Sequence, residues 1–121
     1  MNDKARLLIY TITSLFIKNV KNENREVVGQ SIESGHCRMV GFYADLQTAM
    51  KCVEEDWAGF DEAGYYNYIV IERMVEGLYN ISGFDLAKPS EWWYRHDYEA
   101  RKWVPCEKPK CLVGTVSFGM G

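Results

Sequence analysis

The sequence predicts an α+β fold, with a mainly antiparallel β-sheet of about five or six strands and one α-helix packed on one face. Three observations lead to this prediction. Segments rich in β-branched and aromatic residues recur between turn residues, one segment has helical periodicity, and the last third has the pattern of a hairpin. A length of 121 residues suits a single domain, which we expect to span residues 1–121.

The first expected strand covers residues 6–18. Apolar side chains occur on both of its faces, and the β-branched Thr11 and Thr13 lie between them, which favours an interior strand. Residues 19–35 are polar and predict either a ragged edge strand or a mobile hairpin. The second expected strand covers residues 37–43.

A helix is predicted over residues 45–57. Asp45 is suited to the N-cap, because its carboxylate can accept a hydrogen bond from a free amide of the first turn. Apolar residues with helical spacing then form one stripe: Leu46, Ala49, Met50, Val53 and Trp57. Lys51, Glu54 and Glu55 lie off this stripe, so we expect them to face water.

The remaining elements are expected to be strands. An acidic turn over residues 60–63 precedes a strand over residues 65–73, which is rich in Tyr, Ile and Val. Residues 92–95 and 101–106 form the arms of a hairpin, and residues 112–118 form a last strand. The two adjacent tryptophans of the first arm must point to opposite faces of the sheet.

Charge is distributed unevenly along the chain. The net charge is −3, but residues 45–87 hold nine Asp and Glu against two Lys and Arg. An acidic middle between mildly basic flanks argues against direct binding of nucleic acid, which requires a concentrated basic face. The aromatic content of 14% is high, and amphipathic rings are common at binding surfaces.

These features predict a binding surface in the middle of the chain. We expect it to contact a basic protein, such as a nucleic-acid-binding effector, and to inhibit it without catalysis. The predicted partner-binding residues are the acids and rings of the helix end and the acidic turn: Glu54, Glu55, Asp56, Trp57, Asp61, Glu62 and Tyr65. The alternative is that these acids only solvate one helix and one turn.

Catalytic and metal-binding motifs are sparse. A Cys37 nucleophile with His96 as its base can be written down, but nothing in the sequence places the two side chains together. Cys106 and Cys111 have a spacing that could provide half a zinc site, with Cys37, His36 and His96 as further ligand candidates. This spacing matches no closed zinc module, so we expect reduced thiols, no metal and no cofactor.

One block of the sequence resembles a recurring block in small proteins of bacteriophages and integrated mobile elements. The block is GFYADLQTAMKCVEEDWAGFDEAGYYNYIVIERMVEGLYN, and EWWYRHDYEARKWVPCEKP extends the likeness more loosely, over about two thirds of the chain. The resemblance implies an accessory protein of a phage or mobile element, some of which are anti-CRISPR or other anti-defence inhibitors. It assigns no functional residue.

Two further function classes remain open. A module that sequesters a small molecule or a nucleotide signal would need cations around phosphate, and the candidates are Arg38, Arg73, Arg95, Arg101 and Lys102. An enzyme or zinc-binding protein is the other class. The longest apolar run, residues 7–17, is too short and too interrupted by Ser and Thr to span a bilayer, and no signal peptide precedes it. We therefore expect a protein of the bacterial cytoplasm with no membrane partner, in an oligomeric state that the sequence leaves open.

Overall fold

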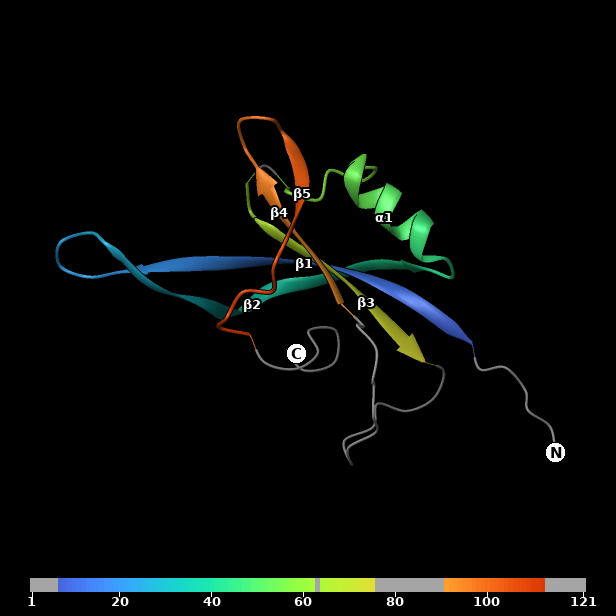
Figure 1. The fold of residues 1–121 in the computed structure, drawn as a ribbon, viewed down its shortest axis with the longest axis horizontal. Helices are drawn as coiled ribbons and strands as arrows, with labels where there is room; N and C mark the ends of the chain where they lie inside the picture. Colours follow the sequence, from blue (N-terminus) through green and yellow to red (C-terminus); the bar gives the residue numbers. More distant parts are fainter. Residues whose placement is uncertain (1–6, 63, 76–90, 113–121) are drawn as a thin grey trace, which may run out of the picture.

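The computed structural model of the chain describes residues 7–62, 64–75 and 91–112. Its elements, in chain order, are β1 (Leu8–Lys21), β2 (Val27–Tyr43), α1 (Leu46–Glu54), β3 (Tyr68–Val75), β4 (Glu91–Asp97) and β5 (Lys102–Cys106). The five strands form one antiparallel sheet in the order β2-β1-β3-β4-β5, and α1 packs against one face of it (Figure 1). The predicted α+β fold with a single helix on one face is confirmed.

The first two strands form a long ribbon whose turn projects far from α1 (Figure 1). The turn is held by Asn22, whose side-chain oxygen accepts from the amides of Asn24 and Glu26 at 2.8 and 3.0 Å. Residues 19–35, predicted as a ragged edge strand or a mobile hairpin, form the end of β1, a turn and the first part of β2, which is an edge strand whose register with β1 shifts. Backbone pairing between the strands outweighs the polar composition of the stretch.

β1 lies between β2 and β3, which confirms the prediction of an interior strand. Its central residues are buried even where they are polar, as Thr11, Thr13 and Ser14 show. The Thr11 hydroxyl donates to the main-chain carbonyl of Glu72 at 3.3 Å, so this buried group is satisfied within the sheet. β1 extends to Lys21, three residues beyond the predicted end.

The main core lies between the sheet and α1. Side chains from the three inner strands, from β5, from the helix and from the turn after the helix form it: Ile12, Ala49, Cys52, Val53, Phe60, Ile69, Ile71, Tyr94 and Trp103. Asp45 caps the helix as predicted, since its carboxylate accepts from the Thr48 amide at 2.9 Å. The helix ends at Glu54 and not at Trp57, because Asp56 adopts a φ of 49° that an α-helix cannot continue. Trp57 therefore leaves the predicted stripe and is 49% exposed.

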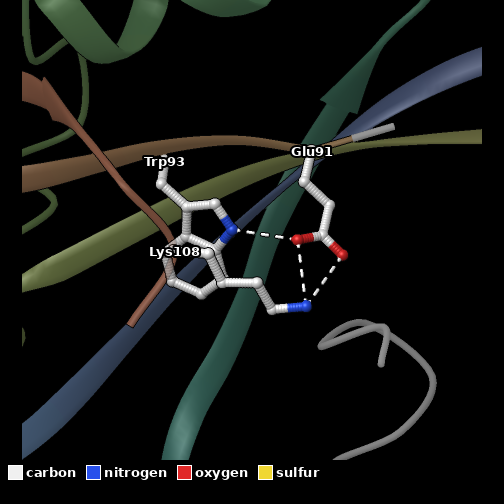
Figure 2. A network of polar contacts seen from close by, with 3 residues as sticks. All are labelled: Glu91, Trp93 and Lys108. Atoms are coloured by element: carbon white, nitrogen blue, oxygen red, sulfur yellow. Dashed lines mark hydrogen bonds and ion pairs between the residues drawn. The ribbon is translucent and has the colours of Figure 1, made fainter. Parts of the chain in front are cut away.

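A second cluster covers part of the opposite face of the sheet. It consists of Leu15, Ile17, Val70, Trp93 and Leu112. Trp93 lies in this cluster, whereas the adjacent Trp92 packs against the core on the helix side, as expected for neighbouring residues of a strand. Figure 2 shows how the segment after β5 is held here: the Lys108 ammonium lies 3.1 Å from a carboxylate oxygen of Glu91, which also accepts from the Trp93 indole at 3.0 Å.

β3 begins at Tyr68 and not at Tyr65, because the preceding residues belong to a compact turn. In this turn the Tyr66 amide donates to the Asp61 carbonyl at 3.1 Å, and Gly64 adopts a φ of 92° that favours glycine. The hairpin of β4 and β5 confirms the two predicted arms. The predicted last strand, apart from Leu112, lies outside the described residues, and Leu112 itself is not in a strand.

Candidate protein-binding surface

The predicted binding residues lie at the end of α1 and in the turn that leads to β3. This turn is anchored by Phe60, whose ring is buried in the core and whose amide donates to the Asp56 carboxylate at 2.8 Å. The same Asp56 has the left-handed backbone conformation that ends the helix. Asp56 thus shapes the turn, and the residues around the anchored Phe60 are held in place.

We call the seven predicted residues the acidic aromatic surface; they are Glu54, Glu55, Asp56, Trp57, Asp61, Glu62 and Tyr65. Five of them are exposed, and Asp56 and Asp61 are half-buried. The two rings, Trp57 and Tyr65, are 49% and 46% exposed. The structure therefore leaves most of this surface open to solvent, as a binding surface requires.

Glu54 has a structural role that the sequence did not indicate. Its carboxylate accepts from the hydroxyl of the buried Tyr94 at 3.1 Å, which joins the last turn of α1 to β4. Desolvation raises the pKa of the Tyr94 phenol well above its usual range, and the charge of Glu54 and this hydrogen bond raise it further. Glu54 therefore holds the helix on the sheet.

Glu55 and Trp57 form a pair at the surface. The indole N–H of Trp57 donates to the Glu55 carboxylate at 2.9 Å, and the ring meets Tyr43 edge to face with centroids 6.1 Å apart. Lys51 lies 4.0 Å from the same carboxylate, one helical turn earlier, with both side chains largely exposed. An exposed pair at this distance contributes little to stability, so Glu55 keeps its capacity to interact with a partner.

Glu62 lies beside an arginine from β2. The Arg38 guanidinium is 3.2 Å from the Glu62 carboxylate, and both side chains are exposed. Tyr65 stacks on the buried Tyr66 with centroids 4.8 Å apart. Desolvation raises the pKa of the Tyr66 phenol, the charge of Glu62 adds to this effect, and Arg38 opposes it, which places all three groups close together.

One aromatic residue of this region was not predicted from the sequence. Tyr98, in the turn between β4 and β5, is 55% exposed. The pKa of its phenol is raised by desolvation and then by the charge of Asp61, a residue far from it in sequence. A ring in a predicted hairpin turn was the only signal in the sequence, and it could not show which segment lies beside that turn.

The structure separates Cys37 from His96, and Arg73 from Arg95. Cys37 packs on the face of the sheet away from α1, whereas His96 meets Trp103 of the main core edge to face, so nucleophile and base lie on opposite faces. Desolvation raises the pKa of the Cys37 thiol, which disfavours the reactive thiolate. Arg73 and Arg95 also lie on opposite faces and near opposite ends of their paired strands, which separates them as phosphate ligands.

Metal ligands do not gather in the part of the chain that the structure describes: no three His, Cys, Asp or Glu side chains there are placed to hold an ion.

A groove of about 350 Å³ lies beside the start of β4, between Met50 of the helix, Trp92 and Lys108. Among the described residues, no helix is long and apolar enough to cross a bilayer.

No protein family model, curated protein or solved structure matches the chain. The function is therefore inferred from the acidic aromatic surface and from the neighbours that the fold gives it.

Proposed function

We propose that the protein is a non-enzymatic inhibitor that binds a basic host protein through the acidic aromatic surface. The observation that carries this proposal is the anchored turn between α1 and β3, which keeps exposed acids beside the exposed Trp57 and Tyr65. A held turn of this kind loses little conformational entropy when it binds. Acids around exposed rings resemble the polar rim and aromatic anchors of protein interfaces.

The partner that fits best is a protein whose own ligand is nucleic acid. Such a protein has a basic groove, and an acidic surface of complementary shape can occupy that groove in place of the phosphates. Long-range attraction between the two surfaces would speed the encounter, while buried aromatic side chains would slow dissociation. Together with the resemblance to accessory proteins of phages and mobile elements, this favours an effector of host defence, such as a CRISPR nuclease, in the bacterial cytoplasm.

The structure indicates which acids to change in a test. Glu54 and Asp56 hold the helix end and the turn, so their substitution would confuse binding with folding. Glu55 and Glu62 are exposed, and their ion pairs involve exposed partners only. We therefore choose the double variant Glu55→Lys with Glu62→Lys, which should leave the melting temperature nearly unchanged.

A matched control reverses two exposed acids elsewhere, Glu23 in the ribbon turn and Glu107 after β5. Both double variants change the net charge equally, so a difference between them reports the position of the charges. The parent protein and the control should capture a nucleic-acid-binding protein from a bacterial lysate and compete with its nucleic acid, and the surface variant should lose both activities. Equal capture and equal inhibition by the surface variant would show that these acids only solvate the turn.

A further inference from the structure

The end of the β1–β2 ribbon stands apart from the rest of the sheet. β3 pairs with β1 only as far as Leu15, and beyond Ile17, which the Asn67 side chain contacts, β2 is the only strand beside β1 among the described residues. We call residues 19–29 the ribbon tip; all of them are exposed, and the tip projects far from α1 (Figure 1). A ribbon of two strands is only marginally stable in water, so contact with another surface would stabilise the tip.

Three valines are concentrated in the ribbon tip. Val20, Val27 and Val28 are 40%, 55% and 62% exposed. Val20 lies opposite Gly29 and Lys21 opposite Val27, so Val28 is the extra residue of a bulge between two neighbouring pairs. Single exposed apolar side chains are common on protein surfaces, whereas several at one place mark a site of interaction.

The turn of the ribbon tip holds an arginine in an unfavourable backbone conformation. The Asn22 amide donates to the Glu26 carbonyl and the Arg25 amide to the Asn22 carbonyl, both at 3.0 Å. Arg25 adopts a φ of 64°, in the left-handed region that favours Gly and Asn. Strain of this kind at an exposed position indicates a role for the side chain, and the hydrogen-bonded turn presents that side chain at a fixed place.

Charges of both signs alternate along the ribbon tip. Lys21, Glu23, Arg25 and Glu26 give two cations and two anions, so the tip is neutral, and no ion pair within the described residues involves any of them. Nucleic acid and strongly acidic proteins select a surplus of cations, which the tip does not have. A surface with both signs is instead complementary to a second copy of itself that is rotated about a two-fold axis.

We infer that two copies of the chain form a homodimer through their ribbon tips. The valines of the two tips pack together, and Glu23 and Glu26 of one copy face Lys21 and Arg25 of the other. The acidic aromatic surface, which carries only acids, would repel its own copy and lies away from the tip (Figure 1). The inference is therefore independent of the proposed function, and capture of a partner by that surface does not require the dimer.

Sedimentation velocity of the full chain, from about 1 µM to about 1 mM, tests the inference. The mass of the parent protein should rise with concentration from that of one chain to that of two. Val28→Thr keeps the β-branched shape but places a hydroxyl in the interface of both copies, so it should raise the dissociation constant of the dimer about tenfold. Val40→Thr is the matched control, because Val40 is an exposed valine at another bulge of β2, outside the tip, and it should leave the dimer unchanged.

Two charge variants test the pairing of the tips. Arg25→Glu gives each tip a net charge of −2, so the two copies should repel each other and remain monomeric. Glu23→Arg combined with Arg25→Glu makes the tip neutral again and should restore the dimer. This double variant has the same substitution at the strained position, so a restored dimer would show that the single variant loses association and not its fold.

The results that would overturn the inference are distinct from those of the capture experiment. A parent protein that is monomeric at every concentration would exclude the dimer. A dimer that Val28→Thr and Val40→Thr weaken equally, or that Arg25→Glu leaves intact, would refute the ribbon tip as its interface. A double charge variant that stays monomeric would refute the pairing of opposite charges between the two tips.

Discussion

Asn67 offers the sharpest test of how the sheet is held together. Asn67 lies just before β3, and its side-chain amide makes the two hydrogen bonds that the main chain of a neighbouring strand would make. The amide oxygen accepts from the Ile17 main-chain amide at 2.8 Å, and the amide nitrogen donates to the Ile17 carbonyl at 2.9 Å. The Asn67 main chain also joins β1 and β4, donating to Leu15 and accepting from His96. Asn67→Ala removes the two side-chain bonds and leaves two main-chain groups of Ile17 without them. Each hydrogen bond contributes about 0.5–1.5 kcal/mol, so we expect the free energy of unfolding to fall by about 1–3 kcal/mol.

Urea unfolding followed by tryptophan fluorescence measures this loss. With a slope of about 1–3 kcal/mol per molar urea, the midpoint should fall by roughly 1 M. Asn67→Asp should be destabilising too, because a carboxylate can accept from the Ile17 amide but cannot donate to its carbonyl. Asn24→Ala, in the exposed ribbon turn, is the control and should change stability by less than about 0.5 kcal/mol. A loss for Asn67→Ala as small as that of the control would refute the role assigned to the amide.

Three further predictions concern the helix cap, the buried phenol and a thiol. Asp45→Ala should lower the free energy of unfolding in urea by about 1 kcal/mol, because the Asp45 carboxylate accepts from both the amide and the hydroxyl of Thr48, at 2.9 and 2.8 Å. An unchanged urea midpoint would contradict this role of Asp45. Tyr94→Phe should cost about 1 kcal/mol at neutral pH through the lost bond to Glu54. The pKa of Tyr94 is raised in the folded state, so the neutral phenol stabilises the folded protein below pH 10, and this stabilisation is lost as the pH rises further. At alkaline pH the free energy of unfolding should therefore fall more in the parent protein than in Tyr94→Phe. Desolvation raises the pKa of the Cys106 thiol to about 11, which leaves little of the reactive thiolate at mildly alkaline pH. Alkylation of Cys106, followed by mass spectrometry, should therefore be slower than alkylation of free cysteine. Equal rates would contradict the raised pKa.

The sequence predicted elements whose causes are local. The start of α1 depends on Asp45 and the stripe that follows it, and both are visible in a short window. The end of α1 was missed because Trp57 continues the helical spacing, whereas the chain turns at Asp56, where a carboxylate finds the Phe60 amide. The length of β2 was missed because pairing with β1, and not composition, keeps its polar half extended.

The candidate surface was predictable to the extent that it is contiguous in sequence. Glu54 to Tyr65 belong to one segment, so composition alone brought them together. The neighbours supplied by other strands could not be found in this way, as Arg38 from β2 and Tyr98 from the β4–β5 turn illustrate. The structural role of Glu54 depends on the burial of Tyr94, which also follows only from the packing of α1 on the sheet.

The irregular register between β1 and β2 has a consequence for solubility. β2 is an outer strand of 17 residues with exposed apolar side chains, among them Val28, Met39 and Phe42, and a long regular edge of this kind would invite other chains to add to it. Three register shifts interrupt its pairing with β1. Bulges bend a strand and break the even row of backbone donors and acceptors that an added strand needs. These irregularities therefore protect an apolar, exposed edge strand from aggregation with other chains.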